Sequence, residues 1–287
     1  MHFSVMCAEV LEYLAVRPGG VLLEATAGLG GHTAAIAERL STGVVIACDR
    51  DAESLEIAKR NTEALAARIR YQQAKFSELG SVLSSHGIEK ADGLLADLGA
   101  SRHQLTGDAE RGFSIQADGP LDMRMDRSQA LTAAEIVNTT AEKALADLLF
   151  RLGQERRARR IARAIVRARP IQSTLHLARA VERAAPRTGR FHPATKTFMA
   201  LRLAVNAEQE ELDSLLNLIP ELVRGSGRVV IISFMSLEDA KVKQAFLGLA
   251  RQGRARVLTK HVVRPTREEV RINAASRSAK LRALELL

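Results

Sequence analysis

The sequence is poor in cysteine and in aromatic residues. It contains two cysteines, Cys7 and Cys48, no tryptophan and two tyrosines. Two cysteines supply neither a disulfide framework nor a four-ligand zinc site, so the chain fits a reducing compartment and we expect it in the cytoplasm. Aromatic residues make up 3% of the chain, which argues against a module that binds single strands by stacking many bases.

Long apolar runs are also missing. The longest, such as residues 44–48, are far shorter than the roughly 20 residues of a membrane-spanning helix. The N-terminal residues MHFSV lack the layout of a signal peptide. The histidines are scattered without the spacing of metal ligands. We therefore expect no membrane association and no structural or catalytic metal.

Positive charge is in excess, and it is concentrated in two regions. The 287 residues carry a net charge of +9, with a pI of about 10. Residues 151–190 contain twelve arginines against two acids, and residues 251–287 contain ten basic residues against three acids. The rest of the chain is therefore net acidic. An acidic body with two basic regions predicts binding to a polyanion.

The first hundred residues alternate apolar runs with helical patterns. Strands are expected at 21–24, 43–49, 69–74 and 91–97, which is typical of a doubly wound parallel sheet. From about 106 to 185 the periodicity is helical, and strand patterns return at 227–234 and 256–263. We expect an α/β domain formed by residues 1–105 and 192–287, interrupted by a helical insert at 106–191.

A glycine-rich turn follows the first expected strand. Gly28, Gly30 and Gly31 let the backbone turn tightly and let a ligand approach the main chain. Asp49 ends the next strand, where an acid can bind the hydroxyls of an adenosine ribose. Thr33 replaces the third glycine of the dinucleotide fingerprint, so the pattern favours S-adenosylmethionine, which has cationic groups and no pyrophosphate. The alternative is a turn that only joins a strand to a helix.

Asp97 ends the fourth expected strand. A carboxylate here can accept an N–H bond from an exocyclic amine of cytosine or adenine, localise the lone pair of the nitrogen and direct it toward a methyl group. Asp97 is therefore the candidate catalytic residue. Two other roles stay open, namely contact with the cofactor and capping of a helix.

Distinct motifs are spread along nearly the whole chain. They are GGH at 30–32, DRD at 49–51, DAERGFS at 108–114, DGPLDMRMD at 118–126, RRIARAIV at 159–166, HPAT at 192–195, ISF and SLED at 232–239, and SRSAKLR at 276–282. Together they resemble the RsmH/MraW family, bacterial S-adenosylmethionine-dependent methyltransferases acting on the N4 amine of a cytidine in small-subunit ribosomal RNA. The resemblance implies a Rossmann-like class I methyltransferase fold with an inserted all-helical domain.

The resemblance also implies functional residues. Glu24 stands where the family usually has Asp, Arg102-His103 replace a Ser-Pro pair, and Met235 replaces a histidine. The cofactor positions of the family are all present. They correspond here to Gly30, Gly31 and His32 in the glycine loop, Asp49 as the ribose acid, Phe76 beside the adenine, and Asp97 and Gln104 as the remaining contacts.

The arginine-rich part of the insert has two interpretations. Arg160, Arg163 and Arg167 recur at helical spacing and form one stripe, whereas Ile161 and Ile165 fall on another. We expect the stripe to contact RNA phosphates, because arginine forms bidentate contacts with them. The alternative is a solvated helix face. The basic C-terminal region is expected to contact RNA as well.

The expected function is N4-methylation of a cytidine in the decoding region of 16S ribosomal RNA, with the small ribosomal subunit as partner. A non-catalytic ribosome-assembly RNA-binding factor with a vestigial S-adenosylmethionine pocket is the alternative, motivated by Met235 and Arg102-His103. A methyltransferase of adenine or of DNA is a weaker one. The sequence leaves open whether the chain is a monomer or a homodimer.

Overall fold

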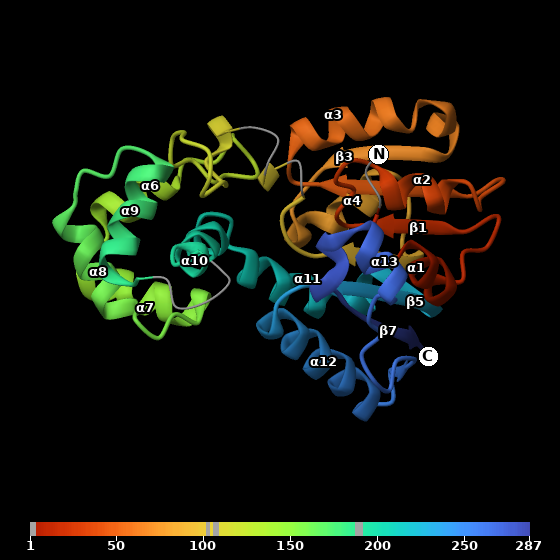
Figure 1. The fold of residues 1–287 in the computed structure, drawn as a ribbon. Helices are drawn as coiled ribbons and strands as arrows, with labels where there is room; N and C mark the ends of the chain where they lie inside the picture. The colour runs from red at the N-terminus through yellow and green to blue at the C-terminus, as the bar shows by residue number, and fades with distance from the viewer. Residues whose placement is uncertain (1–3, 102–103, 106–108, 187–191) are drawn as a thin grey trace. The chain divides into compact units, whose positions relative to one another are not determined.

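The computed structural model describes residues 4–101, 104–105, 109–186 and 192–287 (Figure 1). The chain forms two compact units: unit 1 comprises Met1–Gly99 and Gln209–Leu287, and unit 2 comprises Ala100–Glu208. The sequence analysis sets the second boundary at 191/192 instead. The helix α10 (Thr195–Val205) lies in unit 2 because Phe198 and Leu201 are buried in the core of that unit.

Unit 1 is built on a seven-stranded sheet with the order β3-β2-β1-β4-β5-β7-β6. β7 is antiparallel to both of its neighbours, and the other pairings are parallel. This mixed α/β sheet confirms the predicted Rossmann-like fold class. The strands are β1 (Val21–Glu24), β2 (Val44–Asp49), β3 (Ile69–Gln73), β4 (Ala91–Asp97), β5 (Val223–Ser233), β6 (Ala255–Val257) and β7 (Lys280–Leu286).

The sheet is covered on both faces, because successive strand residues point to opposite sides. Leu23 of β1 belongs to one buried cluster and Leu22 to the other. Leu94 and Leu95 of β4 divide in the same way. The helices of unit 1 are α1 (Cys7–Leu14), α2 (Gly31–Ala37), α3 (Ala52–Asn61), α4 (Leu79–Ser85), α11 (Glu208–Leu222), α12 (Ser236–Arg251) and α13 (Arg267–Ile272), with short 3₁₀ turns at Glu63–Arg68, Phe76–Glu78 and Ala274–Ser278.

The chain reverses its direction of winding between β1 and β4. β1 pairs with β2 on one side and with β4 on the other, so the carboxyl ends of these three strands lie at one edge of the sheet. Ligands of open α/β sheets bind at such a switch point. The fold therefore selects the edge at which Glu24, Asp49 and Asp97 end their strands.

The C-terminal part of the sheet differs from the sequence prediction. A last strand was expected at 256–263, but β6 ends at Val257 and the final strand is β7. The charge of Arg282 interrupts the apolar pattern of β7 and hides it. In the structure Arg282 is 9% exposed, and its Nε donates to Asp239 Oδ1 of α12 at 2.6 Å, which makes a buried arginine acceptable in a strand.

Unit 2 is helical over the residues that the structure describes. Its helices are α6 (Ala133–Thr139), α7 (Glu142–Gly153), α8 (Ala158–Arg167), α9 (Thr174–Ala184) and α10, with a 3₁₀ turn at Ala109–Arg111. They enclose a hydrophobic core of their own that includes Leu145, Ile161 and Leu177. No helix among the described residues is long and apolar enough to cross a membrane.

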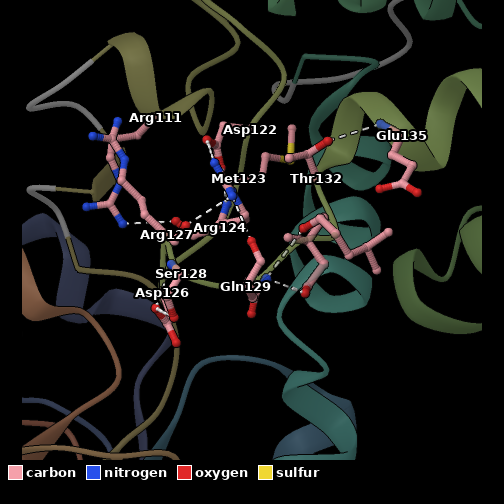
Figure 2. A network of polar contacts seen from close by, with 12 residues as sticks. Arg111, Asp122, Met123, Arg124, Asp126, Arg127, Ser128, Gln129, Thr132 and Glu135 are labelled. Carbon is pink, nitrogen blue, oxygen red and sulfur yellow. Dashed lines mark hydrogen bonds and ion pairs between the residues drawn. The ribbon is translucent and has the colours of Figure 1, made fainter.

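A polar network shapes the segment that carries the motif DGPLDMRMD (Figure 2). Arg124 donates from Nε and Nη2 to the two carboxylate oxygens of Asp122, at 2.8 Å each. The Nη2 of Arg111, a buried residue, donates to the carbonyls of Arg124 and Met125 at 3.0 Å. Asp126 accepts from the backbone and hydroxyl of Ser128. These acids therefore bond within their own segment.

Asn206 fastens this segment to the end of α10. Its side chain is fully buried. Its Oδ1 accepts the N–H of Met125 at 2.8 Å, and its Nδ2 donates to the carbonyls of Met123 at 2.7 Å and Arg202 at 2.9 Å. The motif therefore depends for its conformation on an asparagine about eighty residues away in the sequence.

Replacing Asn206 with alanine leaves the Met125 N–H and the Met123 carbonyl buried without partners. We expect Asn206→Ala to lower the free energy of local opening by about 2–4 kcal/mol. Hydrogen exchange measures this as faster exchange in residues 121–129, with the strands of unit 1 unchanged. The exposed Asn217→Ala is the control. Equal exchange in both variants would show that the side chain does not hold the segment.

Candidate functional site

Two glycines with left-handed backbone conformation shape the loop after β1. Gly28 has φ 52° and Gly30 has φ 86°. A Cβ added to Gly30 would lie 3.0 Å from Thr62 Cγ2, and one added to Gly31 would lie 2.0 Å from Ser4 Oγ. A Cβ at Gly28 would meet no atom within 4 Å. The loop is thus packed tightly on one side and open at Gly28.

Asp49 ends β2 beside this loop. Its Oδ2 accepts the N–H of Gly28 at 2.8 Å, and its Oδ1 accepts the N–H of Asp51 at 2.9 Å. Burial raises the pKa of Asp49 to about 6, against these two hydrogen bonds, which lower it. Asp49 therefore fixes the glycine loop and keeps a carboxylate at the edge of the sheet.

Asp97 ends β4 on the other side of β1. Its backbone N–H donates to Thr26 Oγ1 at 2.6 Å, and its side chain retains 23% exposure. Its Oδ1 is buried without a hydrogen-bond partner in the described part of the chain. Burial, followed by the charge of Glu238, raises the pKa of Asp97 to about 7. A carboxyl group with such a pKa can exchange a proton near neutral pH.

His32 faces Asp97 from the first turn of α2. The ring is 5% exposed, and its Nε2 lies 2.9 Å from the carbonyl oxygen of Val5, which can only accept a hydrogen bond. Nε2 therefore carries the proton. The other ring nitrogen, Nδ1, lies 3.9 Å from Asp97 Oδ2. The N-terminal segment thus sets the orientation of His32 toward Asp97.

Glu24 is a third carboxyl group at this edge, and the sequence analysis gave it no role of its own. It is fully buried, and the hydroxyl of Thr33 donates to its Oε2 at 2.6 Å. Its Oε1 has no partner among the described residues. Burial, with Asp49 and Asp97 nearby, raises the pKa of Glu24 to about 8. The only signal in the sequence was an acid closing an apolar strand.

The other predicted cofactor residues are placed differently. Phe76 begins the 3₁₀ turn that follows β3 and packs, partly buried, against one of the two core clusters of unit 1. Gln104 belongs to unit 2, where its Oε1 accepts the N–H of Ser101 at 2.8 Å. Arg102-His103 lie outside the described residues. Within unit 1 the structure therefore brings together Gly30, Gly31, His32, Asp49 and Asp97, and Gln104 belongs to the other unit.

The arginine stripe lies on α8. Arg160, Arg163 and Arg167 are exposed, while Ile161 and Ile165 are buried. Arg163 Nε lies 3.3 Å from Glu142 Oε1, in a pair that is open to solvent and therefore weak. Over the described residues, no group of three metal-ligating side chains is gathered.

Comparison with known proteins decides the family. Residues 1–287 match the model of the MraW methylase family. The chain belongs to the MraW methylase family. A protein of Solibacter usitatus named ribosomal RNA small subunit methyltransferase H is 60% identical over 286 residues, which cover 100% of both chains. A protein of the same name from Acidobacterium capsulatum is 48% identical over 294 residues, with 99% of this chain and 98% of that protein covered.

Likeness to solved structures is weaker. A crystal structure of an rRNA methylase from Streptococcus thermophilus covers 100% of this chain and 99% of its own, with 13% identity and a TM-score of 0.44. A likeness of this size carries no functional inference. Membership of the MraW methylase family makes the chain a methyltransferase that uses S-adenosylmethionine, as the sequence analysis predicts.

The edge of the sheet fits this methyl donor. The buried oxygens Glu24 Oε1 and Asp97 Oδ1 lack partners in the described part of the chain, so they can accept from a ligand. The main chain at Gly28 is open to close approach. Three carboxyl groups with raised pKa favour a ligand that carries positive charge, which would stabilise their ionised forms.

The protonated Glu24 gives a testable pH dependence. In the unfolded chain its pKa is about 4.3, so between about pH 4 and pH 8 the folded protein holds a proton that the unfolded chain has lost. The free energy of unfolding therefore falls as pH rises through this range. Glu24→Gln cannot ionise, and we expect urea unfolding of this variant to lose less stability between about pH 5 and about pH 8.5.

The exposed Glu12→Gln serves as the control and should keep the slope of the parent protein. If Glu24→Gln and the parent protein lose the same stability over this range, Glu24 is ionised in the folded protein.

Proposed function

We propose that this methyltransferase transfers a methyl group to the N4 amine of a cytidine in the decoding region of 16S ribosomal RNA. The observation that carries the proposal is Asp97. It ends β4 at the edge of the cofactor loop, with one carboxylate oxygen buried and without a partner among the described residues and a pKa near neutrality. The names of the two relatives support small-subunit ribosomal RNA as the substrate.

Different residues at the edge of the sheet would bind different parts of S-adenosylmethionine. Asp49 would hold the ribose hydroxyls, Phe76 would flank the adenine, and the glycine loop with His32 would line the methionine portion. S-adenosylmethionine supplies an electrophilic methyl group on a sulfonium centre. Gln104, on unit 2, is the remaining proposed contact. The ribosomal substrate implies that the protein works in the bacterial cytoplasm.

Asp97 would act on the amine of the substrate. The lone pair of a cytosine N4 amine is delocalised into the ring, which makes the amine a poor nucleophile. An N–H bond to the ionised carboxylate localises that pair on N4, and the same carboxylate accepts the proton that N4 loses as its bond to carbon forms. The base must leave its stack for N4 to reach the site.

An RNA-binding factor without activity is less well supported. Such a protein would have no need for a carboxylate held unpaired at the edge of the sheet. Met235, which departs from the family pattern, still performs a local task, because its backbone N–H donates to Glu238 Oε2 at 3.1 Å and begins α12. The replaced histidine is therefore not needed for the turn after β5.

Replacing Asp97 with asparagine tests the chemistry. We expect Asp97→Asn to reduce methyl transfer to small subunits that lack the modification by at least about 10²-fold, because the amide cannot accept the proton. S-adenosylmethionine affinity, measured by calorimetry, should change much less. In the parent protein the rate should rise with pH through about 7, as Asp97 ionises.

The product nucleoside must be mapped in the same experiment. Label at N4 of cytidine supports the proposal, whereas label only in adenosine or at cytosine C5 refutes it. If Asp97→Asn loses S-adenosylmethionine binding in the same proportion as activity, Asp97 serves the cofactor and not the amine. If the parent protein shows no turnover while its cellular role survives in this variant, the RNA-binding factor is correct.

The arginine stripe on α8 is the proposed RNA contact of unit 2. Neutralising Arg160, Arg163 and Arg167 to glutamine should weaken binding to small subunits by about tenfold or more and flatten its salt dependence, because phosphate contacts are lost. S-adenosylmethionine affinity should stay unchanged. The matched control neutralises Arg39, Arg60 and Arg70, which are exposed on unit 1. Equal weakening in both variants would indicate an effect of net charge alone.

A further inference from the structure

The structure sorts the basic residues of the C-terminal region by position. Residues 251–287 contain ten of them, and the sequence treats them as one block. Three form bonds inside unit 1. Arg256 Nη2 donates to Glu285 Oε1 at 3.0 Å, Arg282 binds Asp239, and Lys280 Nζ donates to Ser236 Oγ at 3.3 Å. These three serve the packing of β6 and β7.

Two more lie at the edge of the sheet away from the cofactor loop. Arg251 ends α12 and Arg254 precedes β6. β6 is antiparallel to β7, and β7 is antiparallel to β5, so β6 begins at the amino ends of the parallel strands. Both arginines are exposed there. Their charge suits a polyanion, but they lie at the edge of the sheet opposite to Asp49 and Asp97.

The remaining five occupy the connection between β6 and β7, residues 258–279, which we name the β6–β7 segment. It begins where β6 ends and finishes where Lys280 pairs with Ser233, at the carboxyl end of β5. The segment therefore lies at the edge that carries Asp49 and Asp97. Its five basic side chains are all exposed, and none makes an ion pair or side-chain hydrogen bond within the described residues: Lys260, Arg264, Arg267, Arg271 and Arg277.

The β6–β7 segment is anchored beside the glycine loop. Val263 forms a bridge with Leu281 of β7. Glu269 of α13 accepts the N–H of Met6 at 2.7 Å, so α13 lies against the start of α1 (Figure 1). The residue before Met6, Val5, accepts the hydrogen bond from His32. Val5 and Met6 thus connect the segment to His32 at the end of the glycine loop.

The acids of the β6–β7 segment do not neutralise its arginines. It contains two, Glu268 and Glu269. Glu269 is engaged with the Met6 backbone, and the burial that accompanies this raises its pKa. Arg267 and Arg271 are four residues apart on α13 and so share one face. What is left is an exposed cationic surface fixed at the edge where the methyl donor binds.

We propose that the β6–β7 segment is a second RNA-binding surface, which holds backbone phosphates next to the methyl-donor site through Arg264, Arg267 and Arg271. The inference rests on the proposed function, because it assumes an RNA substrate. Unit 1 would then bind RNA through residues of its own, independently of the arginine stripe on α8. A single strand passing over this surface would have its phosphates held on the unit that performs the chemistry.

The test compares two triple variants of equal charge in the full-length protein. Arg264, Arg267 and Arg271 are replaced by glutamine in the first variant. In the second the replaced residues are Arg251, Arg254 and Arg17, which precedes the amino end of β1. All six are exposed. We expect the first to bind unmodified small subunits at least about tenfold more weakly, with the salt slope of log K reduced by about 2. The second should bind within about twofold of the parent protein.

S-adenosylmethionine affinity and hydrogen exchange of β1, β2 and β4 report whether the variants stay folded, and both should match the parent protein. Equal weakening in the two triple variants, or none in the first, overturns the proposal. The parent protein provides the separate check. If it neither binds nor methylates small subunits, the proposed function fails, whereas normal activity of the parent with an unaffected first variant refutes only the β6–β7 surface.

Discussion

Carboxyl groups crowded into a desolvated edge set the chemistry of this protein. Parallel pairing of β1 with β2 and β4 brings Glu24, Asp49 and Asp97 to the same end of the sheet. Burial is the first cause of the raised pKa of each, and neighbouring acids raise the pKa of Glu24 and Asp97 further. A cationic ligand would offset both effects, because its charge stabilises the ionised carboxylates against burial and against each other. The same arrangement thus favours a sulfonium donor, and it holds the pKa of Asp97 at about 7.

The two units differ in where their charged residues lie. Unit 1 places Glu24, Asp49 and Asp97 at one edge of the sheet, and its β6–β7 segment presents exposed cations at the same edge. Unit 2 encloses its own hydrophobic core and turns the arginines of α8 outward. Its most distinctive motif, DGPLDMRMD, is held by Asp122, Arg124 and Asn206 in bonds of its own. The polar residues of this motif therefore hold the conformation of a segment of unit 2.

The sequence predicted β1, β2 and β4 because each is an apolar run closed by an acid, and parallel strands place those acids together. It missed β7, whose Arg282 is neutralised by a partner 43 residues away. The bond between Val5 and His32 likewise depends on a terminal segment folding back onto α2. Glu24 was noted only as a departure, since full burial is a property of the assembled sheet. Local sequence patterns predict strands and the spacing of their end residues. They cannot predict contacts between residues far apart in the sequence, because those contacts exist only in the folded protein.

The insertion of unit 2 also has a consequence for biosynthesis. β4 and β5 are neighbours in the sheet, yet β4 ends at Asp97 and β5 begins at Val223. At about 5–20 residues per second, a ribosome needs roughly 6–25 s to make the chain between them. During that interval the side of β4 that pairs with β5 is an open strand edge, whose unpaired N–H and C=O groups can pair with other chains. Unit 2, with a core of its own, can fold in the meantime, whereas the half-sheet of unit 1 keeps an unpaired edge until β5 is made.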